Sequence, residues 1–306
     1  VLDEIENPQH VRGRFTVGAE LMDSRAALDD VGTPISTGIV NSGELLQVYV
    51  HLRGEDHFSP GSRTDLRIGR ITMDVGSRRF VARNRYRNTI NAFTGIDWQL
   101  QRAGGSQLRA FFLLPVNRKP NTPAKLRNND FEFDEQDSEV IFWGLHYAAT
   151  LPSDDHGELL YFGLNEDDST GRPTRNRKLT TIGVRLHRKP QLSRFDYQLE
   201  SALQFGESRT STAATNTTDL DHFAHFQHAE LGYSFDHPWR PRLILQYDYA
   251  TGDDNPTDAD NERFDTLFGA RRFDFGPTGI YGPFARANLN TPGLRLHLKP
   301  SAAITT

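Results

Sequence analysis

Arginine residues are concentrated in one short stretch of this chain. The segment 67–87 reads RIGRITMDVGSRRFVARNRYR. It contains Arg67, Arg70, Arg78, Arg79, Arg83, Arg85 and Arg87. Guanidinium groups stay charged at any relevant pH and bind carboxylates through two parallel hydrogen bonds. Arginines that line a narrow passage would therefore form a track for a polyanion, because they raise the local concentration of anions.

The same segment allows a second interpretation, an exposed basic loop that is balanced by acidic loops nearby. Arg67 and Arg70 lie in or beside a segment with strand-like alternation, so we expect these two residues to face the passage. For the residues from Arg83 to Arg87 both interpretations stay open.

Other charged residues alternate with apolar residues and so share one face of their expected strands. This phase predicts that the following side chains also line the passage: Arg109, Arg185, Arg242, Arg295, Asp97, Glu200 and Asp248. Burying so many charges in a dry core would cost several kcal/mol for each unpaired ion. The interior must therefore be open to water.

Strands are needed to position these side chains. In the hairpin 229–252, Leu231 and Tyr233 alternate with polar residues on one arm, and Leu245 and Tyr247 do so on the other. A period of two indicates strands with one apolar and one polar face. This reading predicts about twelve strands, each near the ~10 residues that a tilted strand needs to cross a bilayer. They are 13–22, 44–53, 64–71, 94–102, 106–115, 139–149, 157–165, 177–188, 193–206, 223–236, 241–251 and 293–299.

The links between the expected strands alternate in length. Links after the even-numbered strands are short: 54–63, 103–105, 150–156, 189–192 and 237–240. Links after the odd-numbered strands are mostly long: 23–43, 72–93, 116–138, 166–176, 207–222 and 252–292. This asymmetry is typical of outer-membrane barrels, which have tight periplasmic turns and long outer loops. The sequence thus predicts an all-β fold, a transmembrane antiparallel up-and-down β-barrel in the bacterial outer membrane.

Composition narrows the classes of function. The chain has 306 residues, of which 36% are hydrophobic, and its mean hydropathy is −0.60, which is low for a dry core of this size. A net charge of −5 argues against a nucleic-acid partner. The longest apolar run, 110–116, is far shorter than the about 20 residues of a membrane helix. A membrane-spanning form would therefore be a barrel, and a β-sandwich with large loops is the soluble alternative.

Two segments resemble a known family. RIGRITMDVGSRRFVARNRYRNT and YDYATGDDNPTDADNERFDTLFGARRF are similar to recurrent segments of the alginate export family of outer-membrane β-barrels. The resemblance implies a monomeric barrel of about eighteen strands, with an arginine-lined constriction through which a negatively charged polysaccharide passes passively. By position, Arg67 and Arg70 match the strand with the Gly-Arg pair, and Arg79 and Arg83 match the basic continuation.

For Arg185, Arg242 and Arg295 the expectation rests on inward phase alone. Because about twelve strands are fewer than the resemblance implies, we expect residues 1–306 to form a single barrel domain that continues after Thr306, and a further start before Val1 stays open. The expected partners are an anionic polysaccharide or oligosaccharide, outer-membrane lipid and periplasmic export components. No cofactor and no catalytic residue are expected.

Several further motifs lie in the second half of the chain. Closely spaced oxygen ligands suit Ca²⁺, and the candidates are Asp253, Asp254, Asp258 and Asp260. They lack the EF-hand order of ligands, so a solvated outer loop is the expectation. The stretch GARRFDFGPTGIYGPFAR is either an inward plug or an ordinary surface excursion. His222, His225 and His228 would cluster on a helix, but in a strand His225 points away from the other two.

The sequence therefore predicts an outer-membrane channel for passive export of an alginate-like polysaccharide. Two other functions stay open, a porin for small anionic or aromatic solutes and an outer-membrane barrel hydrolase. The chain has no Gly-x-Ser-x-Gly elbow, phosphate-binding glycine loop or HExxH motif. A hydrolase could still assemble Ser, His and Asp from distant strands.

Overall fold

The computed structural model describes residues 13–27, 32, 34–84, 87–136, 138–168, 172–270, 272–275 and 285–300. Within these residues one antiparallel sheet dominates, and twelve of its 14 strands follow one another in chain order. They are β1 (Gly13–Ser24), β2 (Asn41–Glu55), β3 (Arg63–Ile71), β4 (Phe93–Gln101), β5 (Gln107–Asn117), β7 (Val140–Thr150), β8 (Asp155–Glu166), β9 (Lys178–Arg188), β10 (Phe195–Ser208), β11 (Leu220–Ser234), β12 (Arg242–Ala250) and β14 (Leu289–His297). All twelve predicted strands are confirmed, with ends that differ by a few residues.

The other two strands, β6 (Glu135–Gln136) and β13 (Asp260–Asn261), contain two residues each and pair with β5 and β11. The helices α1 (Pro123–Arg127) and α2 (Arg272–Phe275) are also short, with five and four residues. No helix in the described part of the chain is long and apolar enough to cross a membrane.

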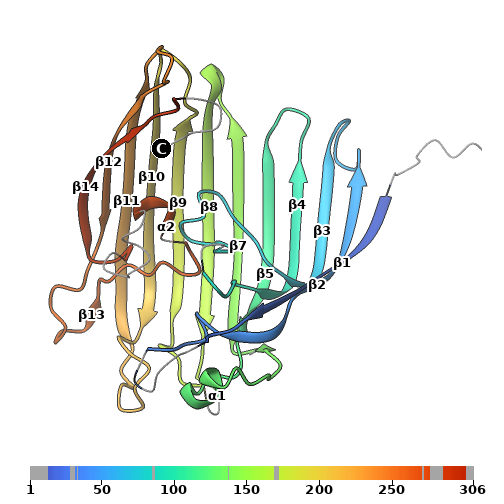
Figure 1. Cartoon of the computed structure of the whole chain (residues 1–306), viewed down its shortest axis with the longest axis vertical. Helices are drawn as coiled ribbons and strands as arrows, with labels where there is room; N and C mark the ends of the chain where they lie inside the picture. Colours follow the sequence, from blue (N-terminus) through green and yellow to red (C-terminus); the bar gives the residue numbers. More distant parts are fainter. Residues whose placement is uncertain are drawn as a thin grey trace, which may run out of the picture.

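Short and long links alternate along the sheet, as the sequence predicts. The short links join β2 to β3, β4 to β5, β7 to β8, β9 to β10 and β11 to β12, and they lie together at one end of the strands (Figure 1). The long links join the remaining consecutive strands at the opposite end and contain both α-helices. One end of the sheet therefore has short turns, and the other has extended loops.

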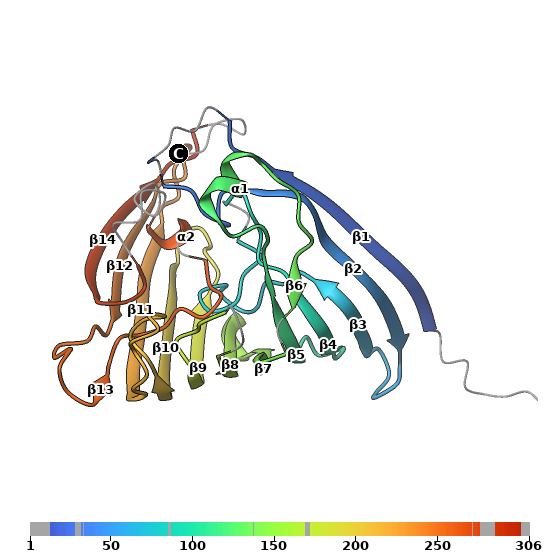
Figure 2. The ribbon, with the colours of Figure 1, turned by 90° about the horizontal axis from the view of Figure 1, so that it is seen from below.

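The sheet is curved into a trough. Figure 2 shows the strands following one another around a concave space, with β1 and β14 at the two sides. Among the described strands β1 pairs only with β2, and β14 pairs only with β12. The described strands therefore form an open, curved sheet with two edges.

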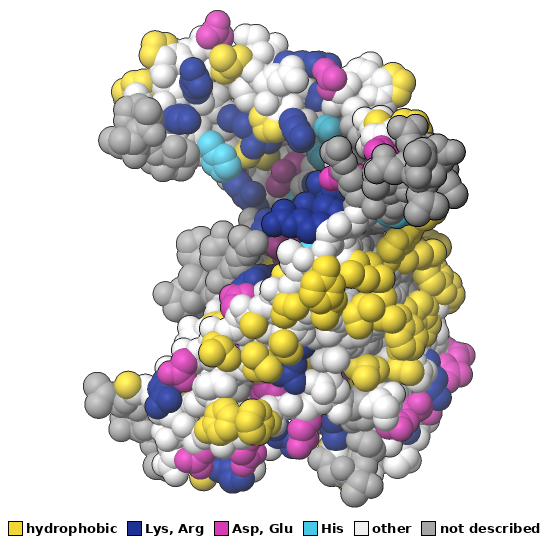
Figure 3. Space-filling view, turned by 90° about the vertical axis from the view of Figure 1, so that its right-hand side faces the viewer, with side chains coloured by type: hydrophobic (Ala, Val, Ile, Leu, Met, Phe, Trp, Pro, Cys, Tyr) yellow, Lys and Arg dark blue, Asp and Glu magenta, His cyan; other side chains and the backbone are white. Residues whose placement is uncertain are grey.

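The polarity of the two faces is the reverse of that in a soluble sandwich. On the outer face, Leu159 and Leu245 expose 56% and 55% of their surface. On the inner face, Gln204 and Asp248 are fully buried. Figure 3 shows hydrophobic side chains gathered on the outer side, and Lys, Arg and His side chains in the hollowed part. No second sheet covers the apolar face among the described residues.

Two long loops have described residues on the concave side and are called the inner loops here: the β3–β4 loop (72–92) and the β12–β14 loop (251–288). Figures 1 and 2 both show helix α2 of the second loop within the curve of the sheet, while the segment near β13 projects from it. The loops pair through a parallel bridge between Val81 and Phe268, and Ala82 N–H donates to the carbonyl of Phe268 at 3.1 Å. The described residues of the stretch 269–286 thus lie on the inner side of the sheet, whereas residues 254–260 of the same loop are exposed, and residues 271 and 276–284 lie outside the described ranges.

A dry aromatic core holds the inner loops against the sheet. The ring of Phe268 lies 5.1 Å from that of Phe93 on β4 and 4.9 Å from that of Phe142 on β7. Phe80 lies edge-on to Phe226 of β11 at 5.7 Å. Gly269 permits the close approach of the two loops, since a Cβ there would lie 1.7 Å from the carbonyl oxygen of Arg79. The interior is therefore filled in part by apolar side chains.

Candidate functional site

Arg67, Asp97 and Arg109 form one cluster on the inner face of β3, β4 and β5. Arg67 faces Asp97 across the sheet and donates to its Oδ2 at 2.6 Å. Arg109 donates from Nε to Asp97 Oδ1 at 2.6 Å and also reaches the carbonyl of Asp74 in the first inner loop. Two of the predicted lining arginines thus meet at a third predicted residue, the fully buried carboxylate of Asp97.

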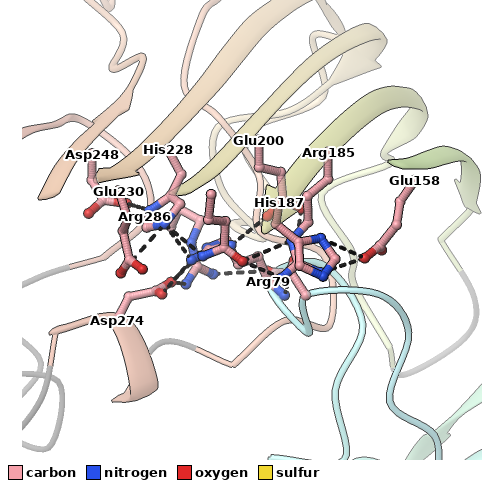
Figure 4. Close-up of polar contacts among 12 residues, drawn as sticks. Arg79, Glu158, Arg185, His187, Glu200, His228, Glu230, Asp248, Asp274 and Arg286 are labelled. Atoms are coloured by element: carbon pink, nitrogen blue, oxygen red, sulfur yellow. Dashed lines mark hydrogen bonds and ion pairs between the residues drawn. The ribbon is translucent and has the colours of Figure 1, made fainter. Parts of the chain in front are cut away.

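Arg79 lies at the centre of a larger cluster where the inner loops meet the wall (Figure 4). Its guanidinium donates to Glu200 Oε2 on β10 at 2.5 Å and to both carboxylate oxygens of Asp274 at 2.8 and 3.0 Å. Arg286 donates to the same carboxylate at 2.5 Å and to the carbonyl of Arg79 at 2.9 Å. Burial alone would lower the pKa of Arg79, but the carboxylates of Asp274 and Glu200 outweigh it and raise this pKa. Both loops are therefore locked to β10 by charge.

His228 and Asp248 complete this cluster from β11 and β12. Arg79 donates an N–H to His228 Nε2 at 2.8 Å, so this nitrogen must be the unprotonated acceptor. The proton then lies on Nδ1, which donates to Asp248 Oδ1 at 2.7 Å. Ser77 Oγ donates to Glu200 Oε1 at 2.8 Å. The histidine thus orients Arg79 and has no free nitrogen with which to activate this serine.

Arg185 lies in a separate group nearer the short links. It donates to Glu158 Oε1 on β8 at 2.5 Å and to Gln198 Oε1 on β10 at 2.9 Å. His146 lies 2.9 Å from the other oxygen of Glu158. One carboxylate on the wall is therefore shared by an arginine and a histidine.

Arg242 and Arg83 each pair with one carboxylate of the wall. Arg242 on β12 donates from Nε to Asp196 Oδ2 on β10 at 3.1 Å. Arg83 in the first inner loop donates to Glu20 Oε1 on β1 at 2.5 Å, and both side chains keep some exposure. Of the two interpretations of Arg83, its pairing with Glu20 agrees with a contact on the inner side and not with an exposed basic loop.

The predicted arginines differ in how far their side chains are exposed. Arg295 on β14 approaches Glu230 at 3.5 Å and exposes 31% of its side chain, and Arg67 exposes 21%. Arg79 exposes only 2%, and Arg109 is also buried. Arg295 and Arg67 are exposed enough to contact a solute in the trough. The buried Arg79 and Arg109 instead hold the wall and the inner loops together.

Arg70 does not share the face of Arg67. Arg70 pairs across the sheet with Val48 and Thr94, while the Arg67 row runs through the inner carboxylate Asp97. Residues three apart in a strand point to opposite faces, so Arg70 lies on the side of Val48. Its guanidinium donates to the carbonyl of Leu45 at 3.1 Å.

Asp265 clamps the second inner loop to the long-link ends of β8–β10. Arg177 donates to its Oδ2 at 2.9 Å, Arg175 donates to the same oxygen, and its backbone N–H donates to Gln204 Oε1 at 2.8 Å. Burial raises the pKa of a carboxylate, but the charges of Arg177 and Arg175 outweigh this effect and lower the pKa of Asp265 to about 2. The carboxylate therefore stays ionised while the loop is docked.

This clamp predicts a pH dependence of stability. The folded pKa of Asp265, about 2, lies below the ordinary 3.8, so its contribution of about 2 kcal/mol is fully present above about pH 4 and is lost as the pH falls toward 2. We expect Asp265→Asn to lower the thermal midpoint of the chain by a constant amount from pH 7 to pH 4, and by less at each step below pH 4. A midpoint difference that persists unchanged at pH 2 would contradict the clamp. Thermal unfolding in detergent, followed by far-UV circular dichroism, measures it.

The candidate Ca²⁺ ligands of the acidic loop 253–260 do not belong to the charged clusters described above. Asp253, Asp254 and Asp258 lie in the β12–β14 loop, and the negative charge of Asp254, followed by those of Asp258 and Asp253, raises the pKa of Glu262. In the described ranges no three Asp, Glu or His side chains are arranged to hold a metal ion. His225 lies on the outer face of β11 against Tyr249, away from the other two histidines, as the strand phase predicts.

Sequence reasoning missed Asp274 and Arg286, which share the central cluster with Arg79. Both lie in the stretch that stayed open as plug or surface excursion, and most of its residues between them are outside the described ranges. A signal was present in the inward phase of the strands, where Phe93, Phe142 and Phe226 interrupt the polar residues. Three aromatic side chains on a wet face indicate that an apolar segment covers them.

The structure is an up-and-down antiparallel sheet with an apolar outer face and a charged inner face, a pattern that is typical of membrane β-barrel proteins. The chain belongs to the Alginate export family, whose model matches residues 4–306. This membership suggests an outer-membrane channel for alginate export. A search of curated proteins and a search of solved structures found no match.

Proposed function

We propose that this chain forms an outer-membrane channel through which an anionic, alginate-like polysaccharide passes passively along the inner face of the sheet. The observation that carries this function is the series of partly exposed inner arginines, Arg67, Arg185, Arg242 and Arg295, each beside a carboxylate. Membership of the Alginate export family supports the same substrate class.

The proposed channel is a closed transmembrane barrel of about eighteen strands, with the short links toward the periplasm and the long links outside. The exposed apolar outer face supports this, because a water-soluble protein rarely leaves such a large apolar face in contact with water. Each chain has its own pore, and periplasmic export components would deliver the polymer to it. No cofactor or energy source is needed for passive movement.

Paired charges explain how a polymer can move without being trapped. A guanidinium has five N–H donors, and a neighbouring carboxylate occupies only some of them. A uronate of the polymer can therefore bind Arg185 or Arg242 while Glu158 or Asp196 remains beside it. The protein carboxylate then competes for the same donors and weakens the complex, which lets the polymer move to the next arginine.

Neutralising two of these arginines tests the channel. We expect Arg185→Gln with Arg242→Gln to lower the preference for anions and to weaken block by uronate oligomers by about tenfold, since charge-assisted hydrogen bonds contribute roughly 1.5–3 kcal/mol. Reversal potentials in planar bilayers under a salt gradient measure the preference. The matched control is Arg188→Gln, which removes an arginine paired with Asp155 at 2.7 Å outside the inner face. A cation-selective native channel, or equal effects of both variants, would refute the role of the inner arginines.

The filled interior favours a second candidate function, a porin for small anionic or aromatic solutes. The inner loops and the aromatic core around Phe268 occupy part of the trough and leave less room for a chain molecule. A small-solute porin would be blocked by single carboxylates and would be indifferent to uronate oligomers. Liposome swelling with uronate oligomers, galacturonate and neutral sugars separates the two functions.

A further inference from the structure

Four buried side-chain oxygens at the start of β2 have no hydrogen-bond partner among the described residues. They are Oδ1 of Asn41, Oγ of Ser42 and both carboxylate oxygens of Glu44. Glu44 exposes only 3% of its surface, so bulk water does not reach its carboxylate. A buried carboxylate without a partner is costly, and such a group indicates that a ligand belongs beside it.

Glu44 lies past the end of β3, on the side of the sheet with the long links. β3 pairs with β2 only as far as Val48, so residues 41–47 extend beyond it. A hollow of about 330 Å³, called the β2 hollow here, lies between this extension and the segment 131–136 of the β5–β7 loop. Glu44 and Thr94 line it, and Thr94 Oγ1 is a fifth buried oxygen without a partner in the described part of the chain.

Asp134 brings a second buried carboxylate to the β2 hollow. Its side chain exposes 2%, and its oxygens accept hydrogen bonds from the backbone N–H of Lys119 at 2.9 Å and from the Asn41 amide at 3.0 Å. The Asn41 side chain also lies beside Glu44, and the negative charge of Asp134 acts on Glu44. Two carboxylates and one amide oxygen therefore meet here, and a cation between them would remove the repulsion of the carboxylates.

The arginines nearby do not supply the missing contact. The charges of Arg118 and Arg70 act on Glu44. Arg118, however, donates to the carbonyl of Ile90 at 2.6 Å, and Arg70 donates to the carbonyl of Leu45 at 3.1 Å. Neither guanidinium donates a hydrogen bond to Glu44. The described residues therefore leave this carboxylate without a direct partner.

We propose that the β2 hollow binds one Ca²⁺, with the carboxylates of Glu44 and Asp134 and the amide oxygen of Asn41 as ligands. Hard cations bind carboxylate, amide and hydroxyl oxygens, and every unpartnered atom of this group is an oxygen. A single water could donate only two hydrogen bonds and would leave the charge of Glu44 uncompensated. Ca²⁺ fits better than Mg²⁺, which usually keeps several of its waters, because bulk water does not reach these oxygens.

A Ca²⁺ at this place ties the β5–β7 loop to the wall, since Asp134 belongs to the loop and Glu44 to β2. The site is separate from the acidic loop 253–260, in which residues 254–260 are exposed. It has no local signal in the sequence, because Asn41 and Asp134 are 93 residues apart. The inference does not depend on what the pore conducts.

Calorimetric titration with CaCl₂ of the chain in detergent, after removal of metal ions with EDTA, tests the site. We expect one equivalent to bind with a dissociation constant of about 10⁻⁴–10⁻³ M, as in extracellular calcium modules. Glu44→Gln keeps the size of the side chain and removes its charge, and should weaken binding at least about tenfold. The matched control is Asp254→Asn, which removes a carboxylate of the acidic loop and should leave binding unchanged.

Two results of this titration would overturn the site. One is a native chain that binds no Ca²⁺, which would mean that a proton neutralises Glu44 instead. The other is binding that persists in Glu44→Gln, with or without a loss in Asp254→Asn. The conductance of the same preparation in planar bilayers separates a failure of this site from a failure of the channel.

Digestion with a lysine-specific protease tests the tie in the native chain, without a substitution. Lys125 lies in the β5–β7 loop and exposes half of its side chain, so cleavage after it reports whether the loop is docked. With Ca²⁺ at ten times its dissociation constant, mass action should slow this cleavage about tenfold relative to EDTA. Lys178 at the start of β9 is the internal control, and its cleavage should not change. Equal rates after Lys125 with Ca²⁺ and with EDTA would overturn the tie.

Discussion

Arg79→Ala is expected to release the two inner loops from the wall and to raise the single-channel conductance. The substitution removes the guanidinium that Glu200 and Asp274 share, and it leaves two buried carboxylates without their main partner. Breaking a buried ion pair in this way costs about 3–5 kcal/mol. The fraction of molecules with undocked inner loops should therefore rise at least about a hundredfold.

Two readouts separate release of the loops from general unfolding. Limited proteolysis should cut between residues 251 and 270 in the Arg79→Ala channel and leave the strands whole, and the conductance should become larger and noisier. Arg53→Ala is the matched control, since Arg53 pairs with Asp65 at 2.8 Å on β2 and β3 and contacts neither inner loop. Neutralising the two stranded carboxylates with Glu200→Gln and Asp274→Asn should restore part of the docking. An Arg79→Ala channel with native conductance and native protease resistance would contradict the lock.

The strands could be predicted from the sequence because each strand has its own local signal. The alternation of Leu231 and Tyr233 with polar residues requires a period of two whatever the chain does elsewhere, and the register of β11 with β12 follows from it. The order of short and long links is equally local. For these reasons the sheet order and the outer face agree with the sequence-based prediction.

The inner site could be predicted only in part. That Asp97 and Arg109 face inward follows from phase, but the binding of both Arg67 and Arg109 to the carboxylate of Asp97 depends on the twist and register of three strands. The opposite faces of Arg67 and Arg70 follow from their spacing of three residues and could have been read directly.

The inner loops were beyond sequence reasoning for a different reason. Arg79 and Asp274 are separated by 195 residues, and neither lies in a segment with a periodic pattern. Nothing local favours their contact over pairing with any other opposite charge. The aromatic core around Phe268 packs the loops against the sheet, and this packing places the two charges side by side.

The charges of the trough therefore have two roles that differ by burial. Pairs in contact with the inner loops, such as those of Arg79 and Asp265, are buried and stabilise one docked arrangement. Pairs on the open wall, such as that of Arg242, keep exposure and can exchange with a solute. The same residue types thus serve structure where water is excluded and recognition where it is admitted.

Ile182→Arg is expected to prevent stable insertion into a bilayer. Ile182 lies in the middle of β9 on the outer face, where it exposes 39% of its surface among other apolar side chains. An arginine that faces lipid near the midplane of a membrane barrel costs about 2–4 kcal/mol. In a soluble protein the same exposed position would accept arginine almost without cost. The substitution thus separates a face that contacts hydrocarbon from one that contacts water.

Urea titration of the chain folded into vesicles measures the free energy of unfolding, with tryptophan emission as the signal. Phe235→Arg is the matched control, because Phe235 is exposed to a similar extent but lies just beyond β11 in a short link. At the interface the cost of arginine falls to about 0–1 kcal/mol, so this variant should fold almost as well as the native chain. Equal stabilities of the two variants would mean that the outer face does not see a gradient of polarity, and the membrane position would have to be given up. A loss confined to Ile182→Arg requires hydrocarbon at the depth of β9 and water at its ends, which is the condition under which an inner face of paired arginines can act as the wall of a pore.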